Sequence, residues 1–252
     1  MKVQLKLVSV ISLFIQLFAV GLSTPSQAAT DVTIAYQGPM TGSEATAGIA
    51  ALNGVKYAIS KFNTTSLNYK VQLATIDDQA DPAIAGRLFP AAIADKDIIG
   101  VIGPLYSGAT KATLPHLIGA GLVAISPAAS NYSLTNQQSS SSGYPVFQRV
   151  IGVNFGAPLA KHSIKGVTSP KVYIVDALEN YSGPQTNAVK ETLTTLNASV
   201  AGTQDVSGEL TDFTPLLAKI KSTGANVIIY LGYDSGAAVF VKQIRDAGLT
   251  AT

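Results

Sequence analysis

The sequence predicts an α/β protein with two lobes, each built from a parallel sheet with helices on both faces. From Val32 onward, strand-like and helix-like stretches alternate, which is typical of βαβ units. The stretch "DIIGVIG" (97–103) is a short continuous apolar run, as expected for a strand covered on both faces. The alternation restarts near residue 151, so we expect a first lobe over residues 30–150 and a second over 151–252.

The first elements follow from periodicity and turn residues. "VTIAY" (32–36) and "YKVQLATI" (69–76) are β-rich runs. Between them, apolar residues fall three, four and three positions apart, which predicts one face of a helix: Leu52, Val55, Ile59 and Phe62. Asp81 precedes Pro82, a capping carboxylate before a proline at the first helical position, so a second helix should begin there.

The later elements repeat this arrangement. A helix from about Ser107 to Ala120 leads to the strand "LVAIS" (122–126). In the second lobe, "KVYIVD" (171–176) and "NVIIYLG" (226–232) are strand-like and are separated by helical stretches. Thr214 before Pro215 predicts a further helix start, with Thr214 as the cap.

Residues 1–29 have the features of a signal peptide. Two lysines precede an apolar run over residues 7–22, and the small-residue stretch "SQAAT" follows, so we expect cleavage after Ala28 or Ala29. The alternative is a membrane anchor, but the run is shorter than the roughly 20 apolar residues that a span needs. The chain has no cysteine, so it can carry neither disulfides nor a lipid-modified N-terminal cysteine. These features predict a periplasmic or other extracytoplasmic protein that is not a lipoprotein.

The charge pattern argues against nucleic-acid binding. The chain has 17 basic and 15 acidic residues, and only 13% of its residues are charged. Two of the basic residues belong to the expected signal peptide, so the remaining chain is balanced. We see no basic stripe that would neutralise phosphates.

Motifs for catalysis, metals and cofactors are not found. His116 and His162 lack a zinc-ligand spacing, and the chain has no nucleophile elbow, phosphate loop or dinucleotide fingerprint. We therefore expect no enzyme activity, no cofactor and no metal. The stretch "DDQAD" (77–81) is the densest carboxylate cluster and could form a cation site or an acid–base pair. The alternative, a strand end followed by a helix cap, is favoured because Pro82 follows Asp81.

The expected strand ends are rich in small and hydroxyl-bearing residues. In open parallel sheets, ligands bind beyond the carboxyl ends of the strands, where loops meet helix N-termini. The stretch "SPAAS" (126–130) ends a buried strand with small or rigid residues, which leaves space for a bound molecule. Similar ends are "GPMTG" (38–42), "GPLYSGAT" (103–110), "DALENYSG" (176–183) and "LGYDSG" (231–236). This pattern favours ligand binding over bond-breaking.

At these stretches the sequence resembles the leucine/isoleucine/valine-binding protein family, the type I periplasmic binding proteins of branched-chain amino-acid ABC transporters. The matching segments are "IAYQGPMTG", "IDDQADPAIA", "VIGPLYSGAT", "ISPAAS", "VFQRV", "DFTPLLAKI" and "IYLGYDSGAAVFVKQIRDAG". The resemblance implies a two-lobed type I periplasmic-binding-protein fold that closes on a free amino acid. It also implies a monomer that delivers this solute to an ABC permease in the membrane.

The resemblance supplies candidate ligand-binding residues. Ser107 and Ser130 match the positions whose hydroxyls hold the ligand's α-carboxylate, and Ala128 and Ala129 match the loop whose backbone helps. Hydroxyl and N–H donors near a helix N-terminus suit a carboxylate. The alternative for Ser107 is a helix cap.

In the second lobe, Tyr181 and Tyr233 match positions that present aromatic rings to the ligand. Their alternative is ordinary packing at a strand end.

Two departures from the family pattern bear on the ligand. Ala47 stands where family members often carry an aromatic residue, so short amides, urea-like molecules or aromatic acids are alternatives to a branched-chain amino acid. A sensing receptor of the same fold, acting on a regulator, is the alternative function. Family members also continue beyond the position of Thr252, so we expect an incomplete second lobe and a truncated chain. The family's acidic partner for the ligand's amino group is expected beyond Thr252.

Overall fold

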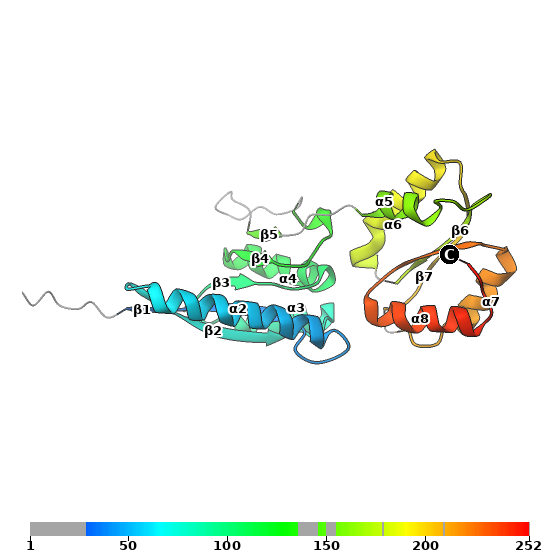
Figure 1. Ribbon diagram of the computed structural model, residues 1–252. Helices are drawn as coiled ribbons and strands as arrows, with labels where there is room; N and C mark the ends of the chain where they lie inside the picture. Colours follow the sequence, from blue (N-terminus) through cyan, green and yellow to red (C-terminus); the bar gives the residue numbers. More distant parts are fainter. Residues whose placement is uncertain (1–28, 136–145, 150–154, 178, 209, 252) are drawn as a thin grey trace, which may run out of the picture.

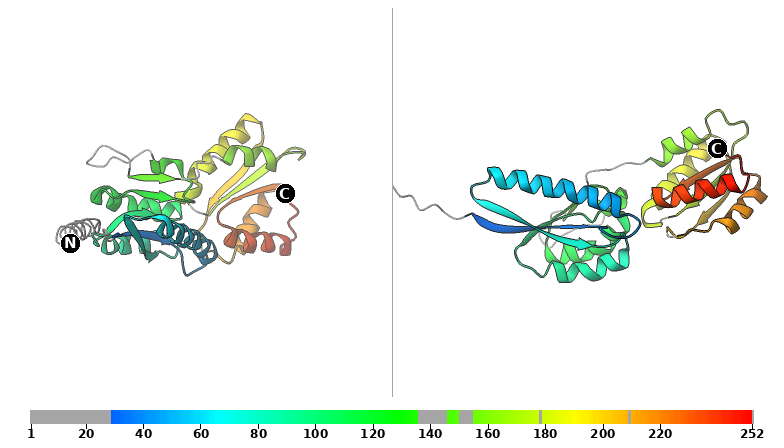
Figure 2. Two further views of the ribbon diagram at one scale, coloured as in Figure 1. Left: turned by 60° about the vertical axis from the view of Figure 1, so that its left-hand side comes forward. Right: turned by 60° about the horizontal axis from the view of Figure 1, so that its bottom comes forward.

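The computed structural model describes residues 29–135, 146–149, 155–177, 179–208 and 210–251 of the 252-residue chain. The described residues form two α/β lobes that lie side by side (Figures 1 and 2). The predicted α/β class with parallel sheets is confirmed. Most of the expected signal peptide, the stretch 136–143 and the expected boundary between residues 150 and 151 lie outside the described residues.

The first lobe contains a five-stranded parallel sheet in the order β2-β1-β3-β4-β5. Its strands are β1 (Thr30–Gly38), β2 (Tyr69–Asp77), β3 (Ile98–Ile102), β4 (Ala124–Ser126) and β5 (Phe147–Arg149). Its helices are α2 (Ala45–Thr65), α3 (Pro82–Ala92), α4 (Ser107–Ala120) and the short 3-10 helix η1 (Tyr132–Thr135).

The helices of the first lobe cover the two faces of its sheet. On one face, Phe89 of α3 and Leu117 of α4 pack with Val101 of β3 and Phe147 of β5 in a buried cluster. On the other face, α2 packs Leu52 and Val55 against Tyr36 of β1. Leu52 and Val55 are apolar positions that the three- and four-residue spacing of α2 predicts, and burial of each contributes about 1.5–3 kcal/mol of favourable free energy.

The second lobe contains a three-stranded parallel sheet in the order β7-β6-β8. Its elements are α5 (Gly156–Ser163), β6 (Lys171–Asp176), α6 (Glu179–Thr195), β7 (Ser199–Asp205), α7 (Thr214–Thr223), β8 (Val227–Leu231) and α8 (Asp234–Asp246). Strand β6 is buried on both faces. Val172 and Ile174 pack toward one helical layer, and Tyr173 and Val175 toward the other. This two-residue alternation follows from the pleat of a strand.

Of the two helix starts that the sequence predicts, the one at Asp81 is confirmed and the cap at Thr214 is wrong. Asp81 caps α3 as expected, because its Oδ1 accepts hydrogen bonds from the N–H groups of Ala83 (2.6 Å) and Ile84 (3.0 Å). Thr214 is not the cap of α7; it is the first helical residue, and Phe213 occupies the N-cap position. Asp212, two residues earlier, accepts a hydrogen bond from the Thr214 N–H at 2.9 Å and so satisfies one backbone donor at the start of this helix.

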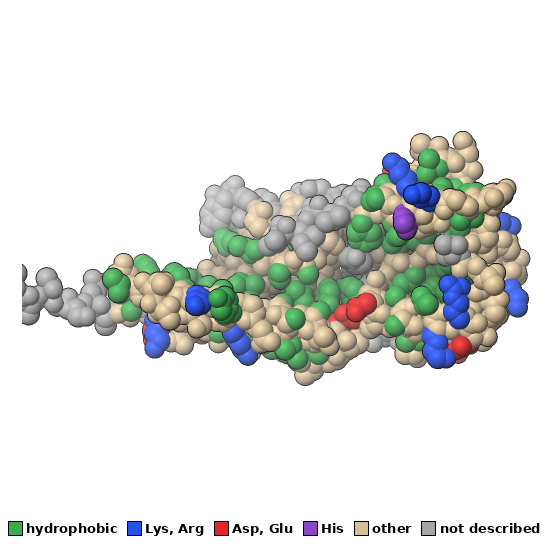
Figure 3. Space-filling model, viewed as in Figure 1, with side chains coloured by type: hydrophobic (Ala, Val, Ile, Leu, Met, Phe, Trp, Pro, Cys, Tyr) green, Lys and Arg blue, Asp and Glu red, His purple; other side chains and the backbone are tan. Residues whose placement is uncertain are grey.

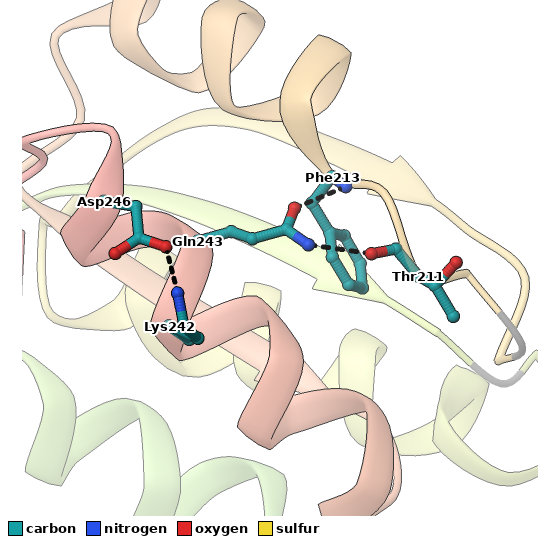
Figure 4. A network of polar contacts seen from close by, with 5 residues as sticks. All are labelled: Thr211, Phe213, Lys242, Gln243 and Asp246. Atoms are coloured by element: carbon teal, nitrogen blue, oxygen red, sulfur yellow. Dashed lines mark hydrogen bonds and ion pairs between the residues drawn. The ribbon is translucent and has the colours of Figure 1, made fainter.

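A side-chain amide joins α8 to the loop before α7 (Figure 4). The Phe213 N–H donates to Gln243 Oε1 at 2.7 Å, and Gln243 Nε2 donates to the Thr211 carbonyl at 2.7 Å. Both amide atoms are therefore satisfied by backbone groups of another segment. The nearby ion pair between Lys242 and Asp246 is exposed and contributes little stability.

One face of the first lobe carries an apolar groove of about 640 Å³ along α2 and strands β1 to β3. Figure 3 shows hydrophobic side chains gathered along this part of the lobe. Phe62, Tyr69 and Ile99 line the groove and are about half exposed.

Within the described residues, none of the helices combines the length and the apolar character that a membrane span requires.

Candidate functional site

The loops that follow β1, β3 and β4 meet at the edge of the first lobe that faces the second lobe (Figure 1). The strands of this sheet are parallel, so their carboxyl ends share one edge. In α/β sheets this edge is where ligands bind. The predicted residues of the first lobe all lie in these loops or in the helix that follows β3.

Ser107 is the first residue of α4 and is 1% exposed. Its Oγ accepts a hydrogen bond from the Asn131 N–H at 3.2 Å, which connects α4 to the loop after β4. The N-cap of α4 is Tyr106, so the alternative role of Ser107 as the cap residue is not what the structure shows. The hydroxyl therefore lies at a helix N-terminus and next to the small-residue loop.

The small-residue loop is organised by Ser126, the last residue of β4. Ser126 Oγ donates to the Pro104 carbonyl at 2.6 Å and so ties the loop after β4 to the loop after β3. The same oxygen accepts the N–H groups of Ala129 (2.9 Å) and Ala128 (3.4 Å). These two N–H groups, which we expected to assist the ligand, are thus already used within the loop. Ligand contact by Ala128 and Ala129 stays a prediction.

Ser130 follows in the same loop and is 7% exposed. The next residue, Asn131, is fixed by its own side chain, since its Oδ1 accepts hydrogen bonds from Ser133 N (2.9 Å) and Ser133 Oγ (2.8 Å). The bond from Asn131 N to Ser107 then places the segment that contains Ser130 beside α4. The structure brings Ser107 and the small-residue loop together, as the ligand-binding prediction requires.

From the second lobe, Tyr233 reaches the first lobe. It is the N-cap residue of α8, and its ring lies 4.5 Å, centroid to centroid, from the ring of Tyr106. Tyr106 immediately precedes Ser107. The two rings, tilted at 38°, therefore form an aromatic contact between the lobes beside the predicted carboxylate site.

Glu44 connects the two lobes through its carboxylate. Its Oε2 accepts a hydrogen bond from the Tyr106 hydroxyl at 2.8 Å, and its Oε1 accepts one from the Ser235 hydroxyl at 2.7 Å. Glu44 is only 5% exposed and lies at the N-terminus of α2, whose positive dipole end favours an acidic residue. Burial and the hydrogen bond to Glu44 raise the pKa of Tyr106 above its usual range, so this phenol stays protonated.

Tyr181 lies in the first turns of α6, and its side chain is outside the described residues. The position of this helix end is set by Asp176, the last residue of β6. Ser182 Oγ donates to Asp176 Oδ1, and Thr186 Oγ1 donates to Asp176 Oδ2 at 2.6 Å. The buried carboxylate thereby holds two turns of α6 against the end of its strand.

At the end of β2, carboxylates of the acidic stretch 77–81 form hydrogen bonds that stabilise neighbouring loops and the start of α3. Asp77 accepts hydrogen bonds from Met40 N (2.8 Å) and Thr41 Oγ1 (2.7 Å), so it anchors the loop after β1. Burial tends to raise the pKa of Asp77, but these hydrogen bonds and that from Gln79 outweigh it and hold the pKa below its usual value. Asp78 is fully buried and its pKa is raised to about 6, first by burial. In the described residues, no group of three acidic or histidine side chains could hold a metal ion.

Sequence reasoning missed three residues of this region: Glu44, Tyr106 and Ser126. Tyr106 lies within the stretch 103–110, and Glu44 lies two residues after the stretch 38–42, so both are polar side chains among small residues near strand ends. Ser126 is the first residue of the small-residue loop itself. Each could have been singled out as a polar group at a strand end, but their partners could not, because these partners are distant in sequence.

The periplasmic binding protein family matches residues 31–252. A Leu/Ile/Val-binding protein of Escherichia coli is 28% identical over 225 residues, which cover 88% of this chain and 60% of that protein. Among solved structures, a leucine-binding protein from Thermotoga maritima has a TM-score of 0.77 at 24% identity, covering 87% of this chain and 61% of that chain. A solute-binding protein of an ABC transporter from R. palustris, solved with 4-hydroxybenzoate, has a TM-score of 0.75 at 22% identity, covering 87% of this chain and 59% of that chain.

These similarities bear on fold and family. The structures, at 24% identity or less, establish the type I periplasmic-binding-protein fold that the sequence predicts. The chain spans about 60% of the length of these relatives, which agrees with an incomplete second lobe. Since the family matches almost all of the described residues, this chain belongs to the periplasmic binding protein family.

Proposed function

We propose that this chain is the ligand-binding part of an extracytoplasmic solute-binding protein that serves an ABC importer. The observation that carries the proposal is the meeting of polar and aromatic groups from both lobes at the strand ends. Ser107 and the small-residue loop come from the first lobe, and Tyr233 comes from the second. A small solute between them would touch both lobes, which is how ligand binding favours a closed arrangement.

The ligand's carboxylate is assigned to Ser107 and Ser130. Ser107 lies at the N-terminus of α4, where hydroxyl donors and the helix dipole favour an anion. Ala128 and Ala129 leave room for the ligand between the two serines. Tyr181 and Tyr233 are assigned to the part of the ligand that faces the second lobe.

We propose a free amino acid, branched-chain or related, as the ligand. The E. coli relative is named for leucine, isoleucine and valine, and the R. palustris protein was solved with an aromatic acid. Aromatic acids, short amides and urea-like molecules are therefore the competing ligands. The relatives are named as binding proteins, and we propose that this chain likewise binds its ligand without catalysis.

Export by the signal peptide over residues 1–29, a monomeric state and an ABC permease as partner belong to the same proposal. A sensing receptor of the same fold is the alternative function, and growth on the ligand as a nutrient separates the two. Deletion of a transport component should abolish uptake of the ligand, whereas deletion of a sensor should leave uptake intact.

Calorimetric titration of the full-length protein tests the proposal. The panel should contain leucine, isoleucine, valine, phenylalanine, acetamide, urea and 4-hydroxybenzoate. Saturable heat with one class of these solutes supports a binding protein and names the class. Absence of heat with the whole panel contradicts the proposal.

A further inference from the structure

The side chain of Glu44 points away from the helix that it begins. Glu44 is the N-cap residue of α2, yet its carboxylate accepts no hydrogen bond from that helix. An N-cap side chain ordinarily accepts one from the backbone N–H groups of the first turn. Instead, Glu44 Oε2 accepts from the Tyr106 hydroxyl of the first lobe at 2.8 Å, and Oε1 accepts from the Ser235 hydroxyl of the second lobe at 2.7 Å. Each lobe therefore supplies one donor to this carboxylate.

The three residues of this contact lie at the starts of three helices. Glu44 precedes α2, Tyr106 is the N-cap residue of α4, and Ser235 is the second residue of α8. Among the side chains that the structure describes, no lysine, arginine or histidine forms an ion pair with Glu44. Helix N-termini carry partial positive charge, so they stabilise the carboxylate in place of a cation. The start of α8 contributes to this only while the lobes are together.

The bond from the second lobe is the one that a motion of the lobes would break. Tyr106 and Glu44 belong to the same lobe, so their bond persists when the lobes part. Glu44 is 5% exposed, whereas Ser235 is an exposed residue at the start of its helix. Parting of the lobes would replace the Ser235 hydroxyl by water and would open neither hydrophobic core. The bond between Glu44 and Ser235 is therefore specific to the closed arrangement.

From this geometry, and resting on the proposed function, we propose that Glu44 and Ser235 form a latch between the lobes that slows the release of a bound solute without touching it. A solute held between two hinged lobes leaves after the lobes part. Because the latch forms only once the lobes meet, it acts on the dissociation rate and not on the first encounter. It slows the release of every solute by the same factor, whereas the residues that contact the solute decide which one binds.

Stopped-flow measurement of association and dissociation by the full-length protein tests the latch, with leucine, phenylalanine and 4-hydroxybenzoate as probes. Ser235→Ala should raise the dissociation rate about 5- to 50-fold for each probe that binds, as expected for a lost hydrogen bond to a charged group, and leave the association rate unchanged. Ser235→Thr keeps a hydroxyl and should restore most of the wild-type rate. Ser222→Ala, an exposed serine of α7, is the matched control and should leave both rates unchanged.

A double-mutant cycle identifies the partner of Ser235. Glu44→Ala with Ser235→Ala should release solute no faster than Glu44→Ala alone, because both substitutions remove the same bond. Effects that multiply would overturn the latch, and so would a wild-type dissociation rate in Ser235→Ala. A factor that differs between probes would also overturn it, because Ser235 would then contact the solute. Ser235→Ala removes one exposed hydroxyl, so it decides the question even if Glu44→Ala fails to fold.

Failure of the latch and failure of the proposed function remain distinguishable. If no solute of the full panel binds, the proposed function fails, and the distance between the lobes still tests the latch without ligand. The 252-residue chain has no cysteine, so paired spin labels at Asn53→Cys on α2 and Lys221→Cys on α7, two exposed positions, report this distance without background. The protein with Ser235 should show a larger fraction of short distances than Ser235→Ala. Equal fractions would overturn the latch.

Discussion

At the scale of single residues, the Asp78 carboxyl group is buried directly after β2, and its pKa is raised from 3.8 to about 6. Burial is the main cause, because it disfavours the charged form. A hydrogen bond from the Ala80 N–H to Asp78 Oδ1 (3.0 Å) opposes the shift but does not cancel it. Burial, and to a lesser degree the nearby Asp78 carboxylate, raise the pKa of Tyr36 to about 12. The Tyr36 hydroxyl donates a hydrogen bond to the Gly48 carbonyl at 2.7 Å.

The raised pKa of Asp78 predicts a measurable pH dependence of stability. The folded state binds a proton more tightly than the unfolded state, so this group destabilises the fold fully above pH 6 and progressively less as the pH falls toward 4. Asp78→Asn should therefore raise the free energy of unfolding at pH 7 by about 1–3 kcal/mol and flatten the profile between pH 4 and 7.

Urea unfolding of wild type and Asp78→Asn at several pH values gives this comparison. Asp95→Asn, an exposed control, should keep the wild-type profile. Equal pH profiles for wild type and Asp78→Asn would show that the pKa of Asp78 is not raised in the folded state. Asp77 does not confuse the result, because its lowered pKa acts below this pH window.

At the scale of elements, helix α2 packs closely on the loop after β1. A Cβ atom at Gly48 would lie 1.6 Å from the Pro39 carbonyl oxygen, so this position needs glycine. A Cβ atom at Gly54, further along the same helix, would meet no neighbouring atom within 4 Å and would face open space. The two glycines differ only in packing, because alanine favours the helix equally at both.

This difference predicts opposite effects of one substitution. Gly48→Ala should destabilise the protein by about 1–3 kcal/mol through overpacking, and it should also weaken ligand binding because α2 begins after Glu44, whose carboxylate joins the two lobes. Gly54→Ala should be neutral or stabilising by up to about 1 kcal/mol. Thermal unfolding and titration of both variants check this. Similar stability of the two variants would mean that the close approach of α2 to Pro39 is not maintained in solution.

The elements themselves could be predicted from the sequence because their determinants are local. The spacing of Leu52 and Val55 and the Asp81–Pro82 pair each specify structure within a few residues. Thr214 shows the limit of this reasoning. A hydroxyl before proline is a common cap, yet the helix starts at Thr214 itself and Asp212 serves its end. Phe213, the N-cap residue, is buried in the core of the second lobe, a tertiary contact that no local pattern records.

The site was predictable only where it depends on residue type at strand ends. Ser107 and Tyr233 were expected at the strand ends where the structure places them, whereas their ligand roles remain predictions. The bond between Glu44 and Ser235 joins residues 191 positions apart, and the hydrogen bonds of Ser126 reach Pro104, 22 positions away. Such pairs depend on how the chain packs within and between the lobes, so no local pattern of residues predicts them.

At the scale of the whole molecule, the proposed ligand is held between two lobes by groups from each. Ser107 lies at the carboxyl edge of the first sheet, and Tyr233 is presented by the second. Because neither lobe alone supplies both, loss of either group should weaken the same binding event.

The most direct measurement is therefore the affinity of the full-length protein for its best ligand after substitution in each lobe. By calorimetry, Ser107→Ala and Tyr233→Ala should each weaken binding by about tenfold or more, as expected for a lost hydrogen bond to a charged group and a lost aromatic contact. Ser222→Ala, an exposed serine of α7, should bind like wild type. Unchanged affinity in either of the first two variants would contradict a ligand site between the lobes.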